Sequence, residues 1–97
     1  MASGTLTADG TGAWVRIEGG NALVNVYDDF DGGNAKLQML ADDEVTAVDV
    51  DGAVWSAPTQ KNVSFGASVW ARIKLDGATD PNLEWEIRPA RGDQGVF

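Results

Sequence analysis

The sequence has 97 residues, of which 43% are hydrophobic, and its 15 acidic and 7 basic side chains give a net charge of −8. This length and composition predict one globular domain with a hydrophobic core of its own. The charge argues against binding to nucleic acid or to an anionic membrane. The absence of cysteine and histidine excludes disulfides, thiolate chemistry and any zinc or copper site built on those residues.

The excess of carboxylates has two interpretations. Negative charge keeps an abundant protein in solution, and it also suits docking on a basic surface of a partner. The apolar runs are only a few residues long, so no segment is expected to span a membrane.

Apolar and polar residues alternate along the chain between clusters of turn-forming residues, a pattern that buries one face of a strand. In chain order, the predicted strands are residues 4–8, 13–18, 21–27, 35–40, 45–50, 53–57, 62–65, 68–75 and 83–88. Residues 9–12, with two glycines, predict a turn, and Pro58 is expected to end the strand before it. Apolar residues nowhere keep helical spacing over the length of a helix, and residues 34–44 come nearest.

Residues 21–40 are the segment around which the predicted fold is organised. Two alternating runs flank the acidic, glycine-bearing turn at residues 28–34, whose glycines readily take the positive φ that a reversal needs. This pattern predicts a β-hairpin. The dipeptide Asp51-Gly52 predicts a second, two-residue hairpin.

The fold class that follows is all-β. About seven or eight short strands, with turns every eight to twelve residues, are typical of an antiparallel β-sandwich or barrel, either jelly-roll or immunoglobulin-like. Residues 1–97 are expected to form this single domain, with a short N-terminal segment and a C-terminal tail at residues 90–97.

Two tryptophans on polar faces of strands are the candidate binding residues. Trp14 and Trp70 share the outward side of their strands with Arg16 and Arg72, whereas Trp85 shares the inward side of its own strand. An outward tryptophan beside an arginine has three interpretations: stacking on that arginine in a surface ladder, anchoring a protein interface, or providing a platform for a sugar. The four residues are therefore the candidate interface.

No catalytic signature is present, and no cofactor is expected. Without histidine or cysteine the usual nucleophile–base pairs are lacking, so we expect no enzyme. The acidic fragments at residues 28–32 and 49–52 leave a Ca²⁺ loop as an alternative to simple turns, although each lacks the first oxygen ligand of such a loop. Residues 91–93 spell Arg-Gly-Asp, the tripeptide that integrins bind, which a chain of this length also contains by chance.

The order of motifs resembles a known family. It runs G-x-L-T-A, then W-V-R-I-E-G-G, then F-D-G-G-x-A-x-L-Q-M, an acidic loop and A-V-D, and it closes with V-W-A-R-I-x-L, D-G-A-T-D-P and L-E-W-E-I-R. Over residues 4–88 the chain resembles the small β-sandwich virion proteins of tailed bacteriophages, namely head decoration (cement) proteins and related appendage or fibre modules.

The resemblance implies a non-enzymatic structural protein of the virion, assembled in the host cytoplasm. It implies a homo-oligomer, often a trimer, bound to the major capsid protein on the outside of the shell. Trp14, Trp70 and Arg72 would be buried at these contacts, and residues 1–8 or the tail would act as an arm. A carbohydrate-binding module, or a tail, neck or fibre component, remains the alternative.

Overall fold

The computed structural model of the chain describes residues 2–18, 21–41, 43, 45–65 and 68–89. These residues form nine strands. No described residue belongs to a helix, so the described part of the chain contains no helix that is long and apolar enough to cross a membrane. The strands are β1 (Ala2–Leu6), β2 (Gly10–Thr11), β3 (Val15–Ile17), β4 (Asn21–Asp29), β5 (Asn34–Leu40), β6 (Ala47–Trp55), β7 (Thr59–Ser64), β8 (Val69–Asp76) and β9 (Asn82–Pro89).

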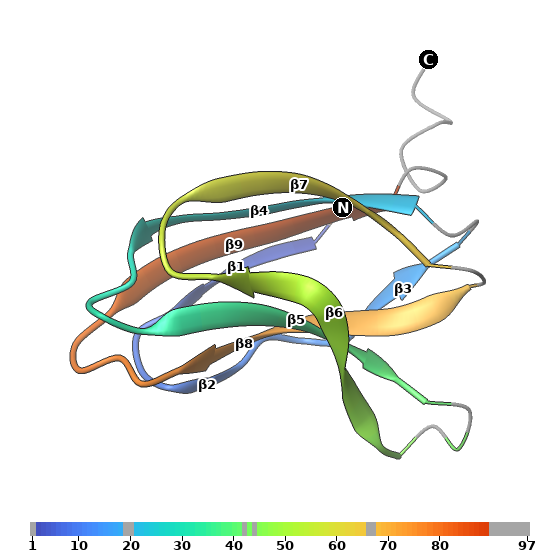
Figure 1. Ribbon diagram of the computed structural model, residues 1–97, viewed down its shortest axis with the longest axis horizontal. Coiled ribbons are helices and arrows are strands. Elements are labelled where there is room, and N and C mark those ends of the chain that lie inside the picture. The colour runs from blue at the N-terminus through green and yellow to red at the C-terminus, as the bar shows by residue number, and fades with distance from the viewer. Residues whose placement is uncertain (1, 19–20, 42, 44, 66–67, 90–97) are drawn as a thin grey trace.

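The strands form two antiparallel sheets that pack face to face, so the predicted sandwich is confirmed (Figure 1). Sheet A has the order β1-β9-β4-β7. Sheet B has the order β2-β8-β5-β6, with β3 on the same edge of β8 as β2.

The strand order selects the jelly-roll alternative. If β2 and β3 count as one interrupted edge strand, β5 and β6 are the only two of the described strands that are both consecutive in the chain and adjacent in a sheet. Every other connection crosses from one sheet to the other, as in a jelly roll of eight strands. An immunoglobulin sandwich would place the first strand beside the second, whereas β1 lies beside β9.

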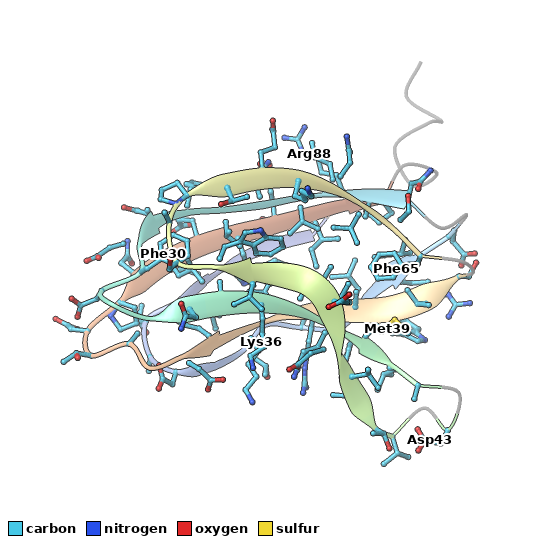
Figure 2. The ribbon with its side chains drawn as sticks, in the orientation of Figure 1. Phe30, Lys36, Met39, Asp43, Phe65 and Arg88 are labelled. Atoms are coloured by element: carbon cyan, nitrogen blue, oxygen red, sulfur yellow. The ribbon has the colours of Figure 1, made fainter. Side chains whose placement is uncertain are left out.

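The core lies between the sheets and follows the predicted alternation. Strands β4, β8 and β9 bury every second side chain, namely Ala22, Val24, Val26, Ala71, Ile73, Leu75, Leu83, Trp85 and Ile87. Fully burying a valine, leucine or isoleucine side chain stabilises the fold by about 1.5–3 kcal/mol. Figure 2 shows Phe30 and Phe65 at opposite ends of the space between the sheets, where both are buried.

The hairpin predicted for residues 21–40 is wrong. Strand β4 lies in sheet A, between β9 and β7, and β5 lies in sheet B, between β8 and β6. The turn that joins them crosses between the sheets and places the buried ring of Phe30 in the core. Within this turn Asp31 and Gly32 take positive φ values of 44° and 80°, and Asp28, near the end of β4, has a φ of 78°.

The hairpin predicted at Asp51-Gly52 is also wrong, because β6 continues through these residues without reversing its direction. Lys36 lies opposite Val54 and Gln38 lies opposite Asp49, so residues 50–53 of β6 face Leu37 alone. Gly52, with a φ of 75°, supplies the unusual backbone conformation of a β-bulge rather than of a chain reversal.

The first strands are shifted from the prediction. Strand β1 covers Ala2–Leu6 instead of residues 4–8, and it is hydrogen-bonded to β9, so this part of the expected N-terminal arm belongs to sheet A. The turn expected at residues 9–12 contains β2. Ala13, expected to face the core, is exposed. The tail at residues 90–97, with its Arg-Gly-Asp tripeptide, lies outside the described residues.

The indole of Trp85 occupies space left by two glycines. Gly4, on β1, and Gly12, hydrogen-bonded to β8, both lie against it. A Cβ atom at Gly12 would lie 2.7 Å from Cζ2 of Trp85, and one at Gly4 would lie 2.9 Å from its Nε1. Gly4 on sheet A and Gly12 beside sheet B therefore make room for the largest side chain of the core.

Strands β6 and β7 are the free edges on one side of the sandwich. On β7, Lys61 pairs with the buried Val24, so its side chain starts from the inward side of this edge strand. Lys61 nevertheless remains exposed, at the border of a small cleft that it shares with residues 50–53 of β6.

Candidate interaction surface

The outer face of sheet B brings the four predicted interface residues together. Arg16 on β3 lies directly opposite Trp70 on β8, and its Cζ atom is 5.5 Å from the centroid of the Trp70 ring. The Cζ atom of Arg72 is 4.3 Å from the centroid of the Trp14 ring. Both distances allow cation–π attraction. We call Trp14, Arg16, Trp70 and Arg72 the tryptophan–arginine ladder.

The stacking partners differ from the simplest expectation. Each tryptophan stacks on the arginine of the neighbouring segment, not on the arginine two residues along its own strand. A guanidinium therefore covers one face of each ring. Trp14 is half-buried, and Trp70 retains 37% of its accessible surface.

A hydrogen-bonded network beside the ladder holds Arg72 in place. Nε of Arg72 donates to Oε1 of Gln38 at 3.0 Å, and Nε2 of Gln38 donates to Oδ1 of Asp49 at 2.9 Å. Gln38 is only 6% exposed. Its hydrogen bond lowers the pKa of Asp49, and the positive charges of Lys36 and Lys74 act in the same direction. The network thus runs from β8 across β5 to β6.

Gln38 and Asp49 were not predicted as parts of this surface. Gln38 shares the polar side of its strand with Lys36, so its sequence position gives no sign that it is buried. Asp49 was interpreted only as part of an acidic turn. No signal in the sequence distinguishes either residue, because their pairing depends on the bulge in β6.

A cleft of about 680 Å³ adjoins the ladder at one end of the sandwich. This volume lies within the range of roughly 300–1,000 Å³ that is usual for binding sites. Its lining combines apolar side chains with charged and hydroxyl groups: Arg16, Met39, Leu40, Ala41, Val48, Asp49, Val50, Asp51, Ser64, Phe65, Ser68, Val69 and Trp70. Two of the four ladder residues therefore also border the cleft.

The turn between β5 and β6 forms a projection beside the cleft, which we call the arm and define as the described residues among 41–46. Figure 1 shows this end of the two strands extending beyond the body of the sandwich, and Figure 2 shows Asp43 at its tip. Oδ1 of Asp43 accepts hydrogen bonds from the backbone N–H groups of Val45 and Thr46, both at 2.9 Å, and Oδ2 accepts one from the Thr46 hydroxyl at 2.7 Å. These bonds, above all those from Thr46, hold the pKa of Asp43 at about 2.

The carboxylates at the other end of the sandwich fix loops. Asp9 accepts hydrogen bonds from the backbone N–H groups of Gly77 and Ala78, at 3.0 and 2.9 Å. Asp31 accepts one from the N–H of Asp80 at 2.6 Å. Within the part of the chain that the structure describes, no three acidic side chains lie close enough together to hold a metal ion. Of the two acidic fragments, residues 28–32 run from the end of β4 into the crossing between the sheets, and residues 49–52 lie in β6.

Comparisons of this chain with models of protein families, with curated proteins and with solved structures find no match.

Proposed function

We propose that this chain is a non-enzymatic structural protein of a tailed-bacteriophage virion, most directly a decoration protein. It binds the major capsid protein on the outside of the shell as a homo-oligomer and reinforces the shell. The order of the sequence motifs supports this proposal. The jelly-roll strand order agrees with it by analogy, since capsid proteins are among the many users of that fold.

The observation that carries the proposal is the tryptophan–arginine ladder. Tryptophan and arginine are the residues most enriched at the energetic centres of protein interfaces. Here they are held in fixed positions, because each ring is stacked and Arg72 is hydrogen-bonded to a buried amide. A surface ordered before binding loses less conformational entropy when a partner covers it.

Binding to purified, expanded capsid shells tests the proposal. We expect stoichiometric uptake of the protein onto shells, measured by co-sedimentation. Trp70→Ala and Arg72→Ala should each weaken uptake about 30-fold or more, the effect of losing an interface contact worth about 2 kcal/mol. Tyr27→Ala, an exposed aromatic residue on sheet A, is the matched control and should bind normally. Failure of the unaltered protein to bind shells would overturn the proposal.

A carbohydrate-binding module is the second candidate, and the cleft is the observation that favours it. Trp70 at its border can stack on a sugar ring, and Asp49, Asp51 and Ser64 can exchange hydrogen bonds with hydroxyl groups. Binding of a glycan there should change the tryptophan fluorescence. Unchanged fluorescence across a panel of glycans would count against this candidate. A tail, neck or fibre location would use the same surface and is distinguished by where labelled protein binds on intact virions.

A further inference from the structure

Among the described strands, three of the four sheet edges carry a feature that hinders the addition of a further strand. On β7, Lys61 starts from the inward side. Strand β6 is bulged at residues 50–53, where Gly52 has a φ of 75°. The edge formed by β2 and β3 is interrupted, with only two and three residues paired to β8. Inward charges, bulges and short strands are the means by which proteins protect the edges of their sheets.

Strand β1, the remaining edge, has none of these features. All five of its residues, Ala2–Leu6, pair with β9 in an unbroken register. The segment contains no charged residue and no proline. No other described strand pairs with the outer side of β1. The N–H and C=O groups on that side are therefore available to an additional strand.

The side chains of β1 divide between the two faces of sheet A. Gly4 lies against the buried Trp85, and Leu6 packs against the core. Ser3 and Thr5 are exposed, and the Thr5 hydroxyl donates to a carboxylate of β9 at 2.8 Å on the outer face. A strand added beside β1 needs the same division, with polar side chains on the outer face.

A second copy of β1 meets this requirement. An antiparallel pair of two β1 strands that is centred on Gly4 gives every residue a partner: Ala2 lies opposite Leu6, Ser3 opposite Thr5, and Gly4 opposite Gly4. Because paired positions share a face, the exposed Ser3 of each copy meets the exposed Thr5 of the other. Hydroxyl pairs of this kind stabilise neighbouring strands. The arrangement is two-fold symmetric, which is the commonest symmetry of homo-oligomers.

Charge also favours contact between two copies through this edge. The net charge of −8 makes two copies repel one another in most orientations. Two β6 edges would bring Asp49 and Asp51 of both copies together, and two β7 edges would do the same with Lys61. Two β1 edges add no charge to the pair. Glu84 and Glu86 are on β9, which would lie about 14 Å from β9 of the second copy, beyond the Debye length of about 8 Å.

We propose that β1 is a dimerisation edge, which pairs antiparallel with β1 of a second copy. The pairing joins the two four-stranded sheets A into one continuous sheet of eight strands. It needs no other protein, so this inference goes beyond the proposed decoration function. It gives the homo-oligomer two-fold symmetry, in place of the trimer that the resemblance of the motifs often implies.

A double substitution on β1 tests the pairing without disturbing the core. Ser3→Lys/Thr5→Lys puts two positive charges into each Ser3–Thr5 pair of the dimer. In the monomer, each lysine lies opposite a glutamate of β9, Glu86 or Glu84, so the fold should be preserved. We expect light scattering to give the unaltered protein twice the chain mass of 10.2 kDa, and the variant the mass of one chain at the same concentration.

The opposite edge of sheet A supplies the matched control. Gln60→Lys/Asn62→Lys makes the same change of charge at two exposed positions of β7 and should leave the dimer intact. A monomeric unaltered protein, or a Ser3→Lys/Thr5→Lys variant that is still dimeric, would overturn the inference.

Cross-linking tests the register, because the chain contains no cysteine. Ser3→Cys and Thr5→Cys proteins with C-terminal tags of different size are mixed and oxidised. Directly opposite residues have Cβ atoms about 4.5–5.5 Å apart, whereas diagonal neighbours are about 7–8 Å apart. We expect the mixed disulfide to form in higher yield than either disulfide between identical sites. Equal yields would contradict the pairing centred on Gly4.

These measurements are made without capsid shells, so they separate the two proposals. If shells take up a protein that stays monomeric in solution, the proposed function stands and the pairing of β1 is refuted. If β1 forms the dimer but shells do not bind it, the pairing stands and the decoration function is refuted.

Discussion

At the scale of single residues, Trp85 shows which part of the packing follows from sequence pattern. Its inward side was predicted from the alternation of residues 83–88, and it is buried as expected. The need for Gly4 and Gly12 was not predictable, because both glycines are far from Trp85 in the sequence. The sequence contains no signal for this role, because Gly4 begins the predicted strand at residues 4–8 and Gly12 belongs to the turn expected at residues 9–12.

We therefore expect Gly12→Ala to destabilise the protein. The added methyl group would lie 2.7 Å from the Trp85 ring, and overpacking of this kind costs about 1–3 kcal/mol. Urea unfolding followed by circular dichroism measures the loss. If the contact is the cause, the smaller ring of Trp85→Phe should cost less in the Gly12→Ala background than in the unaltered protein. Strictly additive effects of the two substitutions would refute this explanation.

The ladder was predictable in its members but not in its pairing. Alternation placed Trp14, Arg16, Trp70 and Arg72 on outward faces, and each does contact another of the four. Which arginine covers which ring depends on the register between β3 and β8. Alternation within one strand carries no information about that register.

At the scale of elements, the existence of strands was well predicted and their connections were not. An alternating pattern indicates that one face of a strand is buried. It does not indicate which of the two sheets contains the strand, because each sheet of a sandwich buries one face. The turns at residues 28–34 and at Asp51-Gly52 contain the residues that hairpins use. The same positive φ values serve a crossing between sheets in one case and a bulge in the other. Whether such residues form a hairpin, a crossing or a bulge depends on the long-range pairing of the flanking strands with β7, β8 and β9.

The structure of the arm should depend on pH, because the Asp43 carboxylate accepts its hydrogen bonds. The pKa of Asp43 is lowered from 3.8 to about 2 in the folded protein, so its hydrogen bonds favour the folded turn above pH 3.8. That contribution should decline as the pH falls from 3.8 and be lost below about 2. We expect the amide proton resonances of Val45 and Thr46 in NMR spectra to shift with a midpoint near pH 2. A midpoint near 3.8 would show that the carboxylate is free of these bonds.

At the scale of the whole molecule, the strand order governs how the chain folds. Among the described strands, β5 and β6 alone pair as consecutive strands, so most of the pairing between these strands joins segments far apart in the sequence. Closing such contacts is slow, because the chain loses entropy before the contacts form. We expect refolding on the order of milliseconds to seconds, measured by stopped-flow tryptophan fluorescence. Completion within microseconds would contradict this topology as the rate-determining feature.

The position of Lys61 has a consequence for the behaviour of the protein at high concentration. A free edge strand can template the addition of further strands, which is a first step toward fibrils. Adding a strand beside β7 and extending sheet B over it would enclose the Lys61 ammonium group and strip it of water, at a large cost in free energy. One charge on the inward side of an edge strand thus disfavours amyloid-like growth from that edge.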